Sequence, residues 1–117
     1  MKVVRLTQHE LQPKQDAELK RIFGEDVEIV QFDESLPTDS RKAVSRFDEI
    51  TADADVAEAV LSVNLIEAML KYSEFSRRGG QIIRSVMDRT QNAEGKVSFN
   101  FAHYEKVVKV ETITERL

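Results

Sequence analysis

Residues 3–32, VVRLTQHELQPKQDAELKRIFGEDVEIVQF, decide the fold of this chain. The stretch opens with an apolar, β-branched run, Val3 to Leu6, which is typical of a short buried strand. A polar loop follows, and a helix is then predicted over residues 12–23. Pro13 is favourable in a first helical turn, and Gly24 can end the helix because glycine readily adopts the left-handed conformation. A second apolar run, Val27 to Phe32, completes a strand–helix–strand unit.

The same alternation continues toward the C-terminus. Apolar residues recur at helical spacing over about residues 40–51, which predicts a helix. A further buried strand and a second helix follow it. In that second helix, Asn64 and Glu67 resemble a capping pair. The predicted elements are a helix over about Ser40 to Thr51, a strand within Ala57 to Val63, a helix from Asn64 to Gly79-Gly80, and a strand over Ile82 to Arg89.

The C-terminal part predicts a β-hairpin. Residues 92–95 read as a turn, and Val97, Phe99, Phe101 and His103 then alternate with more polar neighbours, as expected for a half-buried antiparallel strand. Residues 107–113 either continue this strand past a bulge or form a separate last strand.

The order of elements predicts the fold class. Strand–helix units joined by right-handed crossovers make a mostly parallel sheet. We therefore expect an α/β chain: one small Rossmann-like three-layer domain over residues 1–117, with a C-terminal antiparallel hairpin arm over about residues 81–114.

Composition excludes several classes of site and partner. The chain has no cysteine, so disulfides, thiolate metal sites and a cysteine nucleophile are excluded. A net charge of −4 does not favour binding to duplex nucleic acid. No apolar run approaches the roughly 20 residues that span a bilayer. We expect no metal, no cofactor and no membrane partner, and a cytoplasmic location.

Function is expected beyond the carboxyl ends of the parallel strands, where ligands bind in open α/β sheets. His9 lies on a polar loop rather than an apolar face, which favours an acid/base or ligand role. Each candidate also has a simpler interpretation, such as capping a helix, satisfying a loop or pairing at the surface. The candidate residues are Thr7, Gln8, His9, Asn64, Asp88 and Arg89.

Motifs of common enzyme classes are missing. The sequence has no glycine-rich phosphate loop of standard spacing, no nucleophile elbow and no His-Glu-x-x-His. His103, which ends the apolar face of the hairpin strand, reads more readily as a core or interface histidine than as a functional one. Catalysis, if present, must need few special groups.

Both ends of the chain resemble a known family. Residues 7–15, TQHELQPKQ, are similar to the loop and helix start of small CRISPR-associated single-domain Rossmann-like (CARF-type) proteins of the ring-nuclease group. Residues 84–89, the turn at 94–97 and the run FAHY at 101–104 are similar to that group's last strands. In this chain Asp88-Arg89 stands where the group usually has Lys-Arg.

The resemblance implies a homodimer that binds and cleaves a cyclic oligoadenylate, the second messenger of type III CRISPR defence. Cleavage would be metal-independent, by attack of a 2′-hydroxyl held in line with the phosphorus. His9 and Arg89 would then be catalytic, and Thr7, Gln8, Asn64 and Asp88 would bind the ligand.

Three alternatives stay open. A sensor or sponge would bind a nucleotide messenger in the same loops without cleaving it. An interaction protein would instead use the apolar hairpin as a dimer seam or an edge for a partner. A metal-assisted phosphoesterase would need oxygen ligands from Asp33, Glu34, Asp53 and Asp55.

Overall fold

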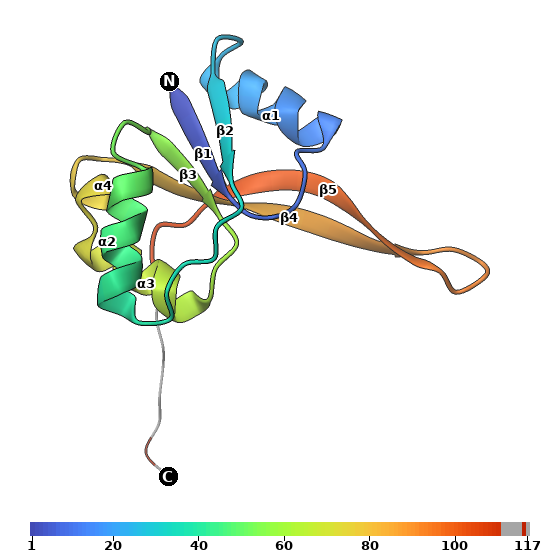
Figure 1. The fold of residues 1–117 in the computed structure, drawn as a ribbon. Coiled ribbons are helices and arrows are strands. Elements are labelled where there is room, and N and C mark those ends of the chain that lie inside the picture. The colour runs from blue at the N-terminus through green and yellow to red at the C-terminus, as the bar shows by residue number, and fades with distance from the viewer. Residues whose placement is uncertain (111–115, 117) are drawn as a thin grey trace.

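The structure, a computed structural model, describes residues 1–110 and residue 116, and it confirms an α/β fold with a mostly parallel sheet and a C-terminal antiparallel strand pair (Figure 1). The elements are β1 (Lys2–Leu6), α1 (Pro13–Phe23), β2 (Glu28–Phe32), α2 (Ser40–Ile50), β3 (Val56–Ala59), α3 (Val63–Tyr72), α4 (Glu74–Arg77), β4 (Gln81–Gln91) and β5 (Val97–Lys106). Among the described residues, no helix has the length and apolar content needed to cross a membrane.

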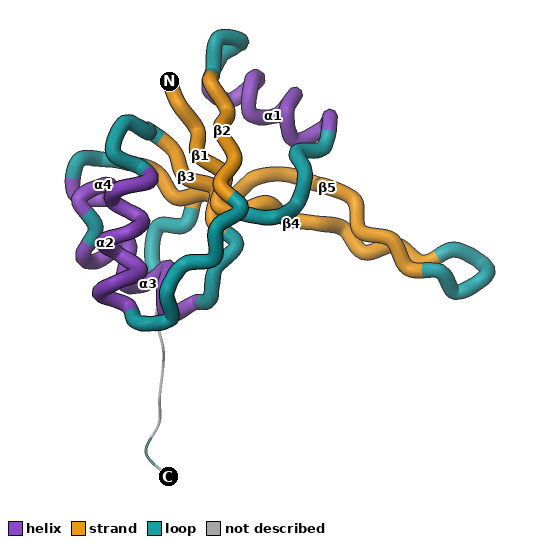
Figure 2. Tube along the Cα trace, viewed as in Figure 1, coloured by secondary structure: helices purple, strands orange, loops and turns teal. Residues whose placement is uncertain are grey.

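The sheet has the strand order β2-β1-β3-β4-β5, parallel from β2 to β4 and antiparallel between β4 and β5. The helix α1 lies on one face, and α2, α3 and α4 lie on the other (Figure 2). The chain leaves β1 toward α1 and leaves β3 toward α3, on opposite faces. The crevice between the carboxyl ends of β1 and β3 is therefore the switch point, where ligands bind in such sheets.

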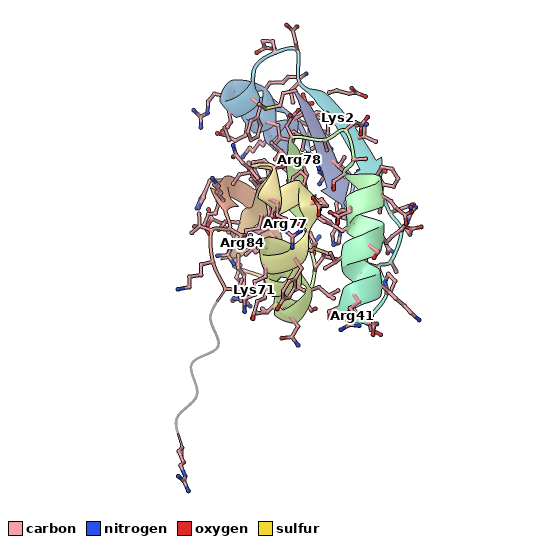
Figure 3. All side chains as sticks on the ribbon, turned by 90° about the vertical axis from the view of Figure 1, so that its left-hand side faces the viewer. Lys2, Arg41, Lys71, Arg77, Arg78 and Arg84 are labelled. Carbon is pink, nitrogen blue, oxygen red and sulfur yellow. The ribbon has the colours of Figure 1, made fainter. Side chains whose placement is uncertain are left out.

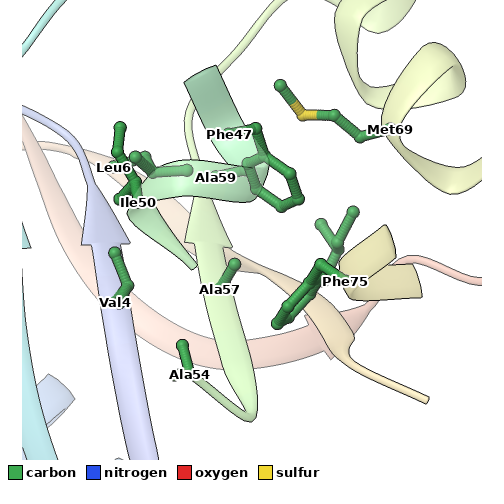
Figure 4. Close-up of a cluster of buried hydrophobic side chains, with 10 residues drawn as sticks. Val4, Leu6, Phe47, Ile50, Ala54, Ala57, Ala59, Met69 and Phe75 are labelled. Atoms are coloured by element: carbon green, nitrogen blue, oxygen red, sulfur yellow. The ribbon is translucent and has the colours of Figure 1, made fainter. Parts of the chain in front are cut away.

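The face under α2, α3 and α4 holds the larger apolar core (Figure 4). Phe47 of α2 meets Phe75 of α4 edge to face, with ring centroids 5.3 Å apart, an arrangement that aromatic pairs prefer. Gly80 lies so close to this pair that an added Cβ would come within 2.5 Å of the Phe75 ring. Gly80 therefore lets the chain pass closely beneath Phe75 into β4.

Three predicted boundaries on this side were wrong. β3 is Val56–Ala59 and ends before Val60, which is exposed. Ser62, not Asn64, caps α3, because the Ser62 hydroxyl accepts a hydrogen bond from the Leu65 N–H. The helix that was expected to reach Gly79 stops at Tyr72, because Ser73 is extended and caps the separate helix α4.

The strands β4 and β5 form a long hairpin that projects from the domain (Figure 1). Every residue from 87 to 100 is exposed, and we call this part the arm. Asp88 and Arg89 therefore lie within a strand of the arm rather than in a loop after β4. Residues 107–110 are not a strand, and the rest of the predicted last strand, residues 111–113, lies outside the described residues.

The strict alternation predicted for β5 is broken by a bulge. Val86 pairs with His103, whereas the next residue, Met87, pairs with Phe101, so Ala102 is an extra residue. The bulge turns His103 to the face opposite Phe101 and leaves it exposed. His103 is therefore not a core histidine; its ring lies 3.5 Å from the Glu105 carboxylate.

Candidate functional site

A row of polar side chains crosses the sheet on its α1 face. It comprises Gln31 of β2, Arg5 of β1, Glu58 of β3 and Tyr104 of β5, and we call it the polar row. Arg5 stands opposite Gln31 on one side and Glu58 on the other in the strand register. Four strands thus contribute to one continuous hydrogen-bond network near the carboxyl end of the sheet.

The centre of the polar row is a buried ion pair. The side chains of Arg5 and Glu58 are each only 1% exposed. Arg5 Nε donates to Glu58 Oε1 and Arg5 Nη2 donates to Glu58 Oε2, both at 3.2 Å, in a two-pronged arrangement. Because burying either charge alone would be very costly, each of the two residues requires the other.

Tyr104 completes the row from the far strand. Its hydroxyl donates to Glu58 Oε1 at 2.6 Å, and its ring packs against Phe101. Burial, and then the hydrogen bond to Glu58, raise the pKa of Tyr104 well above its usual range, so the hydroxyl remains a donor. The bulge at Ala102 makes this contact possible, because it brings Tyr104 rather than His103 to the α1 face.

The polar row also holds the loop of residues 7–12, which we call the His9 loop. Gln31 Nε2 donates to the carbonyl oxygens of Thr7 and His9, both at 3.0 Å. Arg5 Nη1 donates to the same His9 carbonyl at 3.2 Å. Within the loop, the His9 N–H donates to Thr7 Oγ1 at 3.1 Å. The backbone of His9 is thus fixed at three points, whereas its side chain stays exposed.

Two cavities meet at the His9 loop. One, of about 430 Å³, lies on the α1 side and reaches from Arg5 and Glu58 to Met87 and Phe99 of the arm. The other, of about 450 Å³, lies on the α3 side between the ends of β1, β2 and β3. Both are lined by Thr7, His9 and Val60. His9 therefore lies between them, at the switch point of the sheet.

The structure brings together some of the predicted site residues and not others. Thr7 and His9 line both cavities, and Gln8 lines the α3-side cavity. Arg89 is the cross-strand partner of Phe99, but it lines neither cavity, whereas Phe99 lines the α1-side one. Asp88 alternates to the opposite face of the arm, and Asn64 is exposed on the first turn of α3; neither lines these two cavities.

The members of the polar row were not predicted from the sequence, although one signal pointed to them. Strands buried on both faces are nearly continuous apolar runs. Arg5 interrupts the run VVRL, and Glu58 interrupts the run VAEAV. Opposite charges in the middle of two buried strands imply a buried pair. Nothing in the sequence marks Gln31 or Tyr104, because their roles depend on register and on the bulge.

The four acids of the metal hypothesis do not converge. Asp33 and Glu34 follow β2, whereas Asp53 and Asp55 precede β3, at the opposite end of the sheet. Asp53 is paired with the Lys2 ammonium group and Glu34 with Arg46. Within residues 1–110 and 116, no group of three or more potential ligands is placed to hold a metal ion.

Figure 3 labels six basic side chains on one side of the molecule: Arg41 of α2, Lys71 of α3, Arg77 of α4, Arg78 directly after α4, Lys2 of β1 and Arg84 of β4. Lys2, Lys71, Arg77 and Arg84 are each ion-paired with a neighbouring acid. Arg78 is held by backbone carbonyls and lies over the Phe75 ring. Four of the six labelled cations are therefore neutralised by an acid, whereas Arg41 and Arg78 form no ion pair with a described residue.

Comparisons with known proteins assign no family. No protein-family model matches the chain, and no curated protein is significantly similar to it in sequence.

Proposed function

We propose that this chain binds a cyclic oligoadenylate at the His9 loop and opens the ring without a metal ion. The observation that carries the proposal is the His9 loop itself. Its backbone is held by Arg5 and Gln31, and His9 is exposed and lines both cavities at the switch point of the sheet. A site whose backbone is fixed in advance loses little entropy when it orients a ligand.

The proposed chemistry needs few protein groups. The ribose 2′-oxygen attacks the adjacent phosphorus, the bond from phosphorus to the 5′-oxygen breaks, and the products are a 2′,3′-cyclic phosphate and a 5′-hydroxyl. His9 moves a proton from the 2′-hydroxyl or toward the 5′-oxygen. Arg89, the cross-strand partner of Phe99 in the arm, stabilises the charge that develops on the phosphate. Thr7 and Gln8 contact phosphate or ribose.

A homodimer belongs to the same proposal. A cyclic tetra-adenylate is itself roughly two-fold symmetric, and a two-fold dimer would present the His9 loop and Arg89 to it twice. Asn64, Asp88 and Arg89 do not line the two cavities of one subunit. Their predicted ligand contacts would therefore have to come from the arrangement of the second subunit.

The direct test is to incubate the protein with cyclic tri-, tetra- and hexa-adenylate, with and without EDTA, and to identify products by chromatography and mass spectrometry. Linear products that persist in EDTA are expected. His9→Ala should slow cleavage by about 10²–10⁴-fold, the usual contribution of an acid/base group. His103→Ala is the matched control, because it removes the other histidine, which is exposed on β5. Equal loss in both variants would contradict the role of His9.

One observation favours binding without cleavage as a second candidate. Arg5 is the only lysine or arginine among the residues that line the two cavities, and its three nitrogens are engaged with Glu58, Gln31 and the His9 carbonyl. A sensor or sponge needs no free cation to stabilise a transition state. An intact ring that co-elutes with the protein would support this candidate.

A further inference from the structure

The α1-side cavity has an unused hydrogen-bond donor in its wall. Gln15 of α1 is only 4% exposed, and its Oε1 accepts a hydrogen bond from the Gln12 N–H at 2.9 Å. Among the described residues, its amide nitrogen donates to no partner. No side-chain nitrogen or oxygen of the described residues is both fully buried and unsatisfied, so this nitrogen remains accessible from the cavity that Gln15 lines.

The floor of the same cavity is electrically balanced. Each nitrogen of Arg5 is already engaged, and the Glu58 carboxylate accepts hydrogen bonds from Arg5 and Tyr104. Neither charge is available to a ligand without breaking a buried pair, which would be costly. The cavity floor therefore suits an uncharged group and not a phosphate.

The outer wall is apolar and exposed. Phe99 is 61% exposed, Val60 is 56% exposed and Met87 is 36% exposed, and all three line the cavity. They come from different elements, the end of β3 and the two strands of the arm, but they gather at one opening. Large apolar side chains grouped around a polar floor are the usual composition of a site for a planar ring.

We propose that the α1-side cavity takes a planar, uncharged heterocycle of the nucleobase class, stacked on Phe99 with its polar edge toward Gln15 and Ser85. The cavity volume of about 430 Å³ lies within the usual range for small-molecule sites. This inference rests on the proposed function in one respect: a nucleotide whose phosphate lies at His9 would place its base here. Gln15 and Ser85 supply the amide and hydroxyl that read the edge of the ring.

The test uses four nucleosides (adenosine, guanosine, cytidine and uridine) as probes and ribose 5-phosphate as the control without a base. Amide chemical shifts of the full chain are followed by NMR. At least one nucleoside should shift the signals of Gln15, Ser85 and Phe99, whereas ribose 5-phosphate should leave them unchanged. The proposal is overturned if no nucleoside shifts these signals, or if ribose 5-phosphate shifts them equally.

Phe99→Ala should weaken nucleoside binding roughly tenfold or more, the usual effect of removing a stacking ring. Phe99→Tyr should bind nucleosides about as well as the wild type, because it keeps an aromatic ring at this position. Val97→Ala is the matched control: Val97 is on the same strand and partly exposed, but it does not line the cavity. An affinity of Phe99→Ala within twofold of wild type would contradict the proposal.

Failure of this inference can be distinguished from failure of the proposed function. If cyclic oligoadenylate is cleaved and Phe99→Ala cleaves it with unchanged kcat and KM, the base site is wrong and the cleavage stands. If a nucleoside binds the cavity with the predicted loss in Phe99→Ala, but no ring is opened, the base site stands and the cleavage is wrong.

Discussion

The two faces of the sheet are built differently. On the face under α2, α3 and α4, the strands contribute only apolar side chains to one core, among them Val4, Leu6 and Ala57 (Figure 4). On the α1 face, the amino-terminal half of the sheet is apolar, with Val3 and Val56 packed on Leu19. Its carboxyl-terminal half holds the polar row.

On the α1 face, the side chains of β1 and β3 change from apolar to charged within two residues. Val3 is followed on that face by Arg5, and Val56 by Glu58. An apolar pair at positions 5 and 58 would cost less to bury, and a protein with such a pair is often as stable as one with the ion pair, or more stable. We infer that the ion pair serves to hold the His9 loop, because Arg5 donates to the His9 carbonyl oxygen.

The largest effect is expected from breaking the polar row at its centre. Glu58→Ala leaves the Arg5 charge buried without a partner, which should lower the free energy of unfolding by about 3–5 kcal/mol. Urea unfolding measures this loss. A change below about 1 kcal/mol would mean that the pair is not desolvated as the structure shows.

The double variant Arg5→Met/Glu58→Leu sharpens the comparison. Replacing a buried ion pair by apolar residues of similar volume is often neutral or stabilising. We therefore expect the double variant to lose no more than the roughly 1–2 kcal/mol of the Tyr104–Glu58 hydrogen bond, and to lose ligand binding at the His9 loop. If the double variant is as unstable as Glu58→Ala, the two faces do not differ in the way proposed.

A comparable but independent loss is expected on the opposite face. Met69 of α3 is fully buried in the apolar core. Met69→Ala should lower the free energy of unfolding by about 2–5 kcal/mol through lost burial and a residual cavity. At temperatures where this variant is folded, its ligand affinity should be unchanged, because the His9 loop is held from the other face. A parallel loss of affinity would show that the faces are not separable.

A smaller effect is expected at the end of the polar row. Tyr104→Phe removes a hydrogen bond to a charged group, with an expected loss of about 1–2 kcal/mol, since Tyr104 is only partly buried. The pKa of Tyr104 is raised in the folded state, so its contribution is complete below pH of about 10 and is lost as the pH rises further. Urea unfolding on either side of that pH should show the alkaline loss in wild type and a weaker one in Tyr104→Phe.

The smallest effect is expected from the exposed ion pairs. Hydrogen bonds from Arg46, Lys2 and Arg84 lower the pKa values of Glu34, Asp53 and Glu105, respectively. Their stabilising contributions are present above the ordinary carboxyl range and are lost as the pH falls below about 4.

Because these pairs are exposed, salt should screen them. Acid unfolding in low and high salt should therefore show a slight salt-dependent difference. Arg46→Met should reduce that difference, and an unchanged salt effect in this variant would contradict the role of the Glu34 pair.

The fold followed from local patterns, and much of the site did not. Apolar runs and capping signals predicted the alternation of strands and helices, because those patterns are local. Ser73 ends α3 early because its own hydroxyl caps α4, a choice that helical spacing does not reveal. His9 and Thr7 were predicted because they directly follow a strand. Glu58, Gln31 and Tyr104 meet Arg5 only through strand register and one bulge, which a single sequence does not specify.

The most direct test is to map where a ligand binds on the two faces. Cyclic tetra-adenylate is added to the isotope-labelled wild type and to the Gln31→Met variant. Gln31 is exposed, and the substitution removes its hydrogen bonds to the carbonyl oxygens of Thr7 and His9. We expect the amide shifts to be concentrated in residues 7–15 of the wild type. We also expect Gln31→Met to bind cyclic tetra-adenylate more weakly while its fold stays intact. Shifts confined to α2, α3 and α4, or equal affinity in the two proteins, would contradict it.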